Sequence, residues 1–100
     1  MSPGSIKVRY VGLIENVMGN RQEQVSIETD ITVRELLNLL SEKHGAEFRH
    51  SVLRSTGELR PSVTIHISGR DIKELDGLNT RLPPDSEVTL VITGHPDPGG

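Results

Sequence analysis

The sequence contains no cysteine and no tryptophan, and it has only one tyrosine and one phenylalanine. Without cysteine the chain can form no disulfide, thiol nucleophile or zinc ribbon. So few aromatic side chains leave almost nothing on which nucleic-acid bases could stack. The net charge of −3 is also opposite in sign to the Lys/Arg surfaces that hold phosphates. We therefore expect no thiol chemistry and no nucleic-acid partner.

Long apolar runs are missing as well. No stretch approaches the roughly 18 consecutive apolar residues of a membrane span. The opening Met1–Ser5 lacks the basic start and apolar core of an export signal. We therefore expect no membrane contact and a cytoplasmic location.

The length of 100 residues is enough for one domain with a single hydrophobic core and leaves no room for a second domain. Residues 94–100 contain no aliphatic side chain, so they cannot belong to that core. We predict a flexible N-terminus over residues 1–5, a folded domain over residues 6–93 and a flexible tail over residues 94–100.

Apolar and polar residues alternate in four segments, with the period of half-buried strands. The segments are Ile6–Tyr10, the stretch around Val25 and Ile27, Val63–Ile67 and Val88–Ile92. A turn is predicted over Asn16–Gln22, so that the first two segments form a hairpin with a long loop. Four apolar residues are predicted to fill the connection to the last strand, namely Ile72, Leu75, Leu78 and Leu82.

One amphipathic helix is predicted between the second and third strands. Thr32 and Glu35 have the spacing of a capping box, in which each side chain bonds the backbone N–H of the other residue. Apolar residues follow at i, i+3, i+4 and i+7, namely Val33, Leu36, Leu37 and Leu40. The pattern predicts a helix over Val33–His44. A further short helical turn is predicted from Phe48, Val52 and Leu53.

The predicted order is strand, strand, helix, strand, strand, with room for a short irregular strand before the last one. A single amphipathic helix can cover one face of a mixed sheet. We therefore predict an α+β fold of the β-grasp or ubiquitin-like type, with a mixed sheet of four to five strands covered by one main helix.

Motifs of enzyme active sites are absent, including the nucleophile elbow, the phosphate-binding loop and the His-Glu-x-x-His zinc motif. None of the four histidines has a partner at metal-ligand spacing. Glu23 and Glu28 in the second strand are interpreted as solvated charges and not as a catalytic pair. A weak basic cluster is interpreted as solvated surface; its members are Lys43, Arg49, Arg54 and Arg60, offset by Glu47 and Glu58. We predict no catalytic residue and no metal ligand.

The one unusual chemical feature is the terminus, where Gly99 is followed by Gly100 and its carboxylate. A carboxylate is a poor acyl donor until another enzyme activates it, for example as an acyl-adenylate. Residues without side chains keep the terminus narrow enough to thread into a closed active site. Pro96 and Pro98 favour an extended path for the tail. The alternative is a disordered end that finishes in Gly-Gly without any role.

A set of short segments carries a resemblance to a known family. The segments are Ile6–Tyr10, Asn16–Gln22, Thr32–Leu37, Gly57–Pro61, Val63–Arg70, Leu78–Leu82, Asp85–Val88 and the terminal Gly99–Gly100. In this order the chain resembles the MoaD/ThiS family of ubiquitin-like sulfur carriers, and most closely the small subunit of molybdopterin synthase. The resemblance implies a β-grasp fold and a carrier, or non-catalytic small subunit of a sulfurtransferase complex, without catalytic residues of its own.

The same resemblance implies how the terminus would act. A ubiquitin-activating-type adenylating enzyme would use ATP to adenylate Gly100, with Gly99 as its required neighbour, and the adenylate would become a thiocarboxylate. The thiocarboxylate would donate sulfur in molybdopterin (molybdenum cofactor) biosynthesis, with the large subunit of molybdopterin synthase as a further partner. No cofactor is expected to stay bound to the chain itself.

Other functions stay open beside this one. His95–Pro98 is polar, whereas family members that serve molybdopterin usually carry an apolar, proline-containing stretch there. A related pathway such as tRNA thiolation, or conjugation to proteins through Gly100, is therefore an alternative. In another alternative the chain is a non-covalent ubiquitin-like binding module that never uses its terminus.

A partner surface is predicted on the sheet face opposite the helix. By the alternation count Val11 and Val91 point outward, and the first and last strands of a ubiquitin-like roll are neighbours. The two valines are expected to form a small exposed apolar patch that the activating enzyme recognises. The alternative is two isolated surface valines, which are common in proteins.

Overall fold

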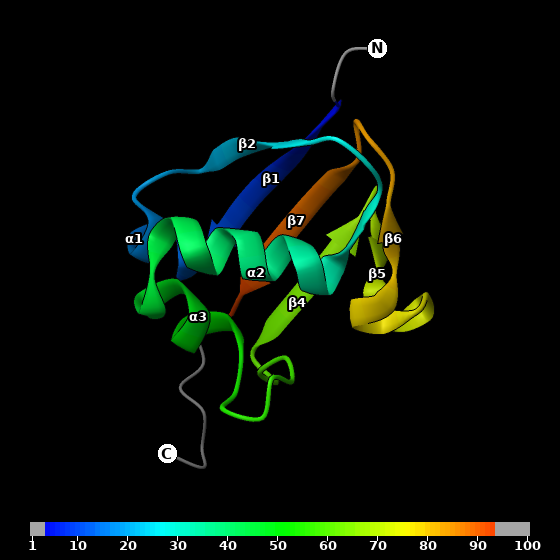
Figure 1. Ribbon diagram of the computed structural model, residues 1–100. Coiled ribbons are helices and arrows are strands. Elements are labelled where there is room, and N and C mark those ends of the chain that lie inside the picture. Colours follow the sequence, from blue (N-terminus) through cyan, green and yellow to red (C-terminus); the bar gives the residue numbers. More distant parts are fainter. Residues whose placement is uncertain (1–3, 94–100) are drawn as a thin grey trace.

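The computed structural model describes residues 4–93, which form a mixed five-stranded sheet crossed on one face by a long helix (Figure 1). The elements in chain order are β1 (Gly4–Gly12), α1 (Ile14–Met18), β2 (Gln22–Ile27), β3 (Ile31–Thr32), α2 (Val33–His44), α3 (Ala46–Val52), β4 (Val63–Ile67), β5 (Arg70–Asp71), the 3-10 turns η1 (Ile72–Glu74) and η2 (Gly77–Asn79), β6 (Arg81–Leu82) and β7 (Glu87–Ile92). The strand order is β2-β1-β7-β4-β5, and β3 pairs with β6 in a separate small sheet.

The two central strands of the sheet, β1 and β7, run parallel to each other. Their outer neighbours β2 and β4 pair with them antiparallel, which makes the sheet mixed. α2 is the main helix on the covered face (Figure 1). The predicted α+β fold of the β-grasp type is therefore confirmed, with five strands in the sheet.

Burial alternates along the central strands as the sequence predicts. In β1, Ile6, Val8 and Tyr10 are at most 1% exposed, and in β7 the even-numbered residues are buried. The parallel register places Val8 beside Val88. The buried side chains of both strands therefore meet on the face that α2 covers, and they form the centre of the core.

α2 begins at the predicted capping box. The Thr32 hydroxyl accepts a hydrogen bond from the Glu35 amide at 3.2 Å, and the Glu35 carboxylate accepts one from the Thr32 amide at 3.0 Å. These bonds satisfy amide groups that a helix N-terminus leaves without intrahelical partners. The predicted apolar stripe is at most 2% exposed: Val33, Leu36, Leu37 and Leu40. The helix ends at His44, as predicted.

The short helical turn predicted after α2 is confirmed as α3, which is seven residues long. Its apolar residues Phe48 and Val52, together with Leu53, are buried in the core. Figure 1 shows α3 next to the C-terminal end of α2. Leu53 then forms an isolated β-bridge with Leu59, which closes the loop that follows α3.

The segment after β1 differs from the prediction. Asn16–Gln22 is predicted as a turn, but the chain forms the short helix α1 before it reaches β2. Three apolar residues at i, i+3 and i+4 pack against the core, namely Ile14, Val17 and Met18. This spacing favours a helix, and Gly19 ends it with a φ of +70°. The predicted hairpin is nevertheless present, because β1 and β2 pair antiparallel.

The sheet also begins earlier than predicted. Gly4 and Ser5, which we assign to the flexible N-terminus from sequence, pair with β2 as the first residues of β1. The Asp85 amide donates to the Ser5 carbonyl at 2.8 Å, which holds this end from the other side. Residues 1–3 and the predicted tail 94–100, including Gly99 and Gly100, lie outside the described residues.

The connection between β4 and β7 is more regular than predicted, because it contains β5, two 3-10 turns and β6. Ser68 and Gly69 lead out of β4 with φ values of +51° and +86°, as expected for a two-residue hairpin turn. Ile72 and Leu82 are buried as predicted. Leu78 is partly buried against the core, whereas Leu75, the C-cap residue of η1, is 36% exposed.

Candidate functional site

The tail root, defined here as Ile92 and Thr93, is the last described part of the chain before the predicted tail. The Ile92 carbonyl accepts a hydrogen bond from the Leu13 amide at 3.1 Å, and the Thr93 amide donates to the Ser62 carbonyl at 3.2 Å. Leu13 follows β1 and Ser62 precedes β4, so the tail root is bonded to both neighbours of β7. These two bonds fix the place at which the chain leaves the sheet.

Gly12 makes the close approach of β1 to the tail root possible. Its φ is +83°, and a Cβ at this position would lie 2.2 Å from the Ile92 carbonyl oxygen. Any other residue would therefore have to push the ends of β1 and β7 apart. Sequence reasoning missed Gly12. The available signal is a glycine at the end of an alternating strand, where it often marks a close backbone approach.

Val11 and Val91, which we call the valine pair, lie side by side at the end of the sheet nearest the tail root. They are register partners in the parallel β1–β7 pair, on the face opposite α2. Val11 is 46% exposed and Val91 is half-buried. Leu13 follows two residues after Val11 and is 49% exposed. Sequence reasoning missed Leu13, because the strand alternation ends before this residue.

The rest of the outward sheet face is polar. Arg9 of β1 and Glu87 of β7 form an exposed ion pair, with 3.5 Å between Arg9 Nε and Glu87 Oε1. Further across the sheet, Thr89 is the register partner of both Arg9 and His66. The outward face is therefore charged toward the start of β7 and apolar at the valine pair, next to the tail root.

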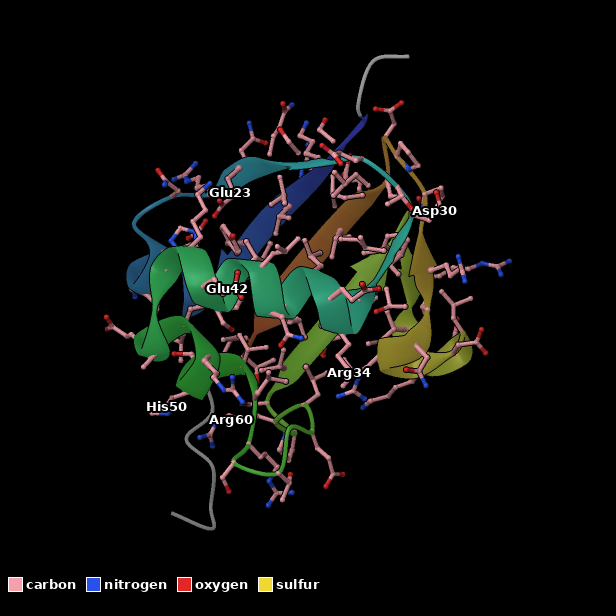
Figure 2. All side chains as sticks on the ribbon, in the orientation of Figure 1. Glu23, Asp30, Arg34, Glu42, His50 and Arg60 are labelled. Atoms are coloured by element: carbon pink, nitrogen blue, oxygen red, sulfur yellow. The ribbon has the colours of Figure 1, made fainter. Side chains whose placement is uncertain are left out.

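A partly buried polar cluster lies on the covered face of the sheet, where Glu23 of β2 faces the C-terminal end of α2 (Figure 2). Its carboxylate accepts hydrogen bonds from Tyr10 Oη at 2.5 Å and Lys43 Nζ at 2.8 Å, and His44 Nε2 lies 2.8 Å away. The Glu23 side chain is only 10% exposed. The interpretation of Glu23 as a solvated charge is therefore wrong. We call these four residues the Glu23 cluster.

The bonds within the Glu23 cluster set its protonation. Burial alone would raise the pKa of Glu23, but the hydrogen bonds from Lys43, Tyr10 and His44 outweigh burial and hold that pKa below its usual range. The pKa of Tyr10 changes in the opposite direction, because burial and the adjacent Glu23 carboxylate raise it far above the usual value for a tyrosine hydroxyl. At neutral pH Glu23 is thus ionised, and the Tyr10 hydroxyl keeps its proton and donates a hydrogen bond to the carboxylate. The cluster joins β1, β2 and α2.

The described residues offer neither a metal site nor a membrane span. Among residues 4–93 no three His, Cys, Asp or Glu side chains are placed so that they could hold a metal ion. No helix in the described part of the chain is long and apolar enough to cross a bilayer.

The sheet order, the parallel central strands and the covering helix define a ubiquitin-like β-grasp domain. The sequence matches the ThiS family over residues 8–93, and the chain belongs to this family. A relative in Archaeoglobus fulgidus, named "Putative sulfur carrier protein", is 32% identical over 90 residues, which cover 89% of this chain and 94% of the relative. The family resemblance predicted from the sequence is confirmed.

Solved structures agree with this assignment of the fold. Urm1 from Trypanosoma brucei has a TM-score of 0.81 at 22% identity, covering 97% of this chain and 100% of that one. SAMP1 from Haloferax volcanii has a TM-score of 0.77 at 24% identity, with the same coverage of 97% and 100%. A Pyrococcus furiosus chain named "Putative molybdopterin converting factor, subunit 1" has a TM-score of 0.71 at 18% identity, covering 90% and 98%. At these identities the likeness concerns the fold.

Proposed function

We propose that this protein is a ubiquitin-like sulfur carrier that is activated at Gly100. Membership of the ThiS family, in a chain whose sequence finishes in Gly99–Gly100, is the observation that carries the proposal. The bonded tail root supports it, because a tail that starts from a fixed point can be delivered to a partner while the domain stays outside. The chemistry then takes place in the partner.

Activation starts from the Gly100 carboxylate, whose oxygens are poor leaving groups. A ubiquitin-activating-type adenylating enzyme joins the AMP part of ATP to the carboxylate and releases pyrophosphate. A sulfide sulfur then attacks the acyl carbon and AMP leaves, so that the carboxylate becomes a thiocarboxylate. ATP is bound by the partner, and this chain contributes no catalytic residue and no cofactor of its own.

The valine pair is the proposed contact for the activating enzyme. It is exposed, it lies at the sheet end from which the tail departs, and it is the apolar part of an otherwise polar face. Burial of two valine side chains against a partner would stabilise the complex without a charge to desolvate. A partner seated there would have the tail beside it.

For the sulfur acceptor we propose molybdopterin biosynthesis, with the large subunit of molybdopterin synthase as the second partner, or a related cytoplasmic pathway. The likeness to the Pyrococcus furiosus chain supports this choice. The second candidate is a protein modifier, which the likeness to the Haloferax volcanii chain supports, because a neighbour of the same fold is named small archaeal modifier protein 1. In that case a lysine amine attacks the activated Gly100 in place of sulfide.

Intact mass spectrometry tests the proposal. The full chain is incubated with an adenylating enzyme of this class, ATP and sulfide, and the expected product has one oxygen replaced by sulfur. A variant that lacks Gly100 is the matched control, and its mass should not change. An unchanged full-length chain would leave the non-covalent binding module as the better interpretation. Addition of a lysine-containing target in place of sulfide distinguishes the modifier, which would give an amide-linked product.

A further inference from the structure

A small cavity lies on the helix side of the molecule, between α2, α3, η2 and the loop that follows α3. Its volume is about 140 Å³. Its apolar lining consists of Leu37, Leu53 and Leu78, and its polar lining includes Arg34, Asn38 and Arg49. The leucines are buried or half-buried and the three polar residues are exposed, so the cavity has an apolar floor and a polar, cationic rim.

The two arginines at the rim have no acidic partner within the described chain. The ion pairs among residues 4–93 involve Arg9, Arg21, Lys43 and His44. No carboxylate lines the cavity. Figure 2 shows Arg34 on the side of α2 that faces the loop after α3. Among the described residues, Arg34 and Arg49 thus stand over a small apolar hollow with no carboxylate at ion-pair distance; Glu42 lines an adjoining pocket that it shares with Arg49.

The size of the cavity restricts what it can hold. A volume of about 140 Å³ is close to the ~150 Å³ that accommodates one benzene molecule. Pockets for drug-sized ligands start at roughly 300 Å³. One side chain therefore fits, and a cofactor does not.

The chemistry of the lining favours a glutamate side chain. Its carboxylate matches the planar fork of an arginine, which can donate two parallel hydrogen bonds to it. Its two methylene groups can cover the leucine floor, which an inorganic phosphate would leave exposed to water. A nucleic acid fits poorly, because the chain carries a net charge of −3.

We propose that this cavity, the Arg34–Arg49 cavity, is a docking site for a glutamate side chain in an acidic segment of a partner protein. It lies on the helix side of the sheet, whereas the valine pair lies on the opposite face. Both surfaces can therefore be occupied at the same time. The inference uses neither the tail nor sulfur chemistry, so it stands independently of the proposed function.

NMR titration of the ¹⁵N-labelled full chain provides the test, with the blocked peptide acetyl-Gly-Leu-Glu-Leu-Gly-amide as the probe. We expect millimolar binding that shifts the signals of Leu37, Leu78 and the guanidinium groups of both arginines. Arg34→Gln and Arg49→Gln should each weaken the binding about tenfold, because each removes a charged hydrogen-bond donor. Arg70→Gln on β5, which is equally exposed but does not line the cavity, should leave it unchanged.

Several outcomes would overturn the proposal. Equal binding of the peptide with glutamine in place of glutamate would remove the role of charge, and binding that survives both substitutions would move the site elsewhere. Tighter binding of inorganic phosphate, or of the phosphoserine version of the peptide, would identify a phosphate site instead. Arg34 and Arg49 are both exposed, so circular dichroism should show both variants folded. The doubly substituted Arg34→Glu, Arg49→Glu chain should bind the lysine version of the peptide.

Discussion

The tail root and the Glu23 cluster both fasten β1 to a neighbouring element, but they use opposite chemistry. At the tail root the contact depends on a missing side chain, because only glycine at position 12 lets the backbone reach Ile92. In the Glu23 cluster the contact depends on charge, because one carboxylate is shared by donors from β1 and α2. The first contact should respond to side-chain volume and the second to pH. The domain thus uses steric fit where the chain must leave in a fixed direction, and ionic bonding where a helix meets an edge strand.

The largest effect is expected from Gly12→Ala. The new Cβ would meet the Ile92 carbonyl oxygen at 2.2 Å, and the positive φ adds strain. We expect the free energy of unfolding to fall by roughly 2–4 kcal/mol in urea denaturation. Gly19→Ala is the matched control, because Gly19 also has a positive φ but nothing lies within 4 Å of its Cβ position. The free energy of unfolding of Gly19→Ala should fall by only about 1 kcal/mol. An equal decrease in both variants would contradict the steric cause.

Glu23→Gln should have the next largest effect. The amide keeps the shape of the carboxylate but removes the charge that Lys43 and His44 face, so we expect a loss of roughly 1–2 kcal/mol. Urea denaturation at neutral pH measures it. Glu28→Gln is the control, since Glu28 lies just beyond β2 and is exposed, and its stability should change by less than about 0.5 kcal/mol. A loss in Glu23→Gln no larger than in this control would mean that the cluster stabilises nothing.

The pH dependence separates the two regions further. The pKa of Glu23 is lowered in the folded protein, so the folded state takes up this proton less readily than the unfolded state. Its stabilisation is complete above the unfolded-state value of about 4.3 and is lost as the pH falls through the lower folded-state pKa. The stability gap between wild type and Glu23→Gln should therefore shrink in acid. The deficit of Gly12→Ala should stay constant, and denaturation at a series of pH values checks both statements.

The smallest effect on stability is expected from Val91→Asp. Val91 points outward and is half-buried, so the loss should stay below about 1 kcal/mol. Turnover by the activating enzyme should nevertheless fall several-fold, because a charge would be placed in the proposed apolar contact. Val91→Thr keeps the branched shape and serves as the control. Unchanged turnover of the aspartate variant would refute the docking role of the valine pair.

Local patterns in the sequence predict most of this fold. The strands follow from alternation and α2 from its capping box and apolar stripe, because these signals depend on residues close together in the chain. The short helix α1 escaped prediction, since three apolar residues in a five-residue helix give little periodicity. The pairing of β1 with β7 was predictable from the β-grasp fold type, in which the first and last strands are neighbours. This pairing places Val11 beside Val91.

The polar contacts were harder to predict. The alternation of β2 gives Glu23 the same orientation as Val25 and Ile27, so its inward direction was readable from the sequence. Its partners were not readable, because Lys43 and His44 are 20 and 21 residues away and meet it only after α2 has crossed the sheet. Gly12 is similar, since its close neighbour Ile92 lies in the last described strand and is distant from Gly12 in the sequence. The roles assigned to Gly99 and Gly100 stay predictions.

β7 comes last among the described strands yet lies in the middle of the sheet, between β1 and β4. Contacts as distant in sequence as Val8 with Val88 must therefore form before the sheet closes, which makes assembly slow and cooperative. Once closed, β7 cannot peel away from one edge, because its release breaks two ladders of hydrogen bonds at once. A force applied to the chain beyond Thr93 would therefore have to break both ladders together, so the domain should resist unfolding from this end. Only a folded domain would hold the start of the tail in a fixed position.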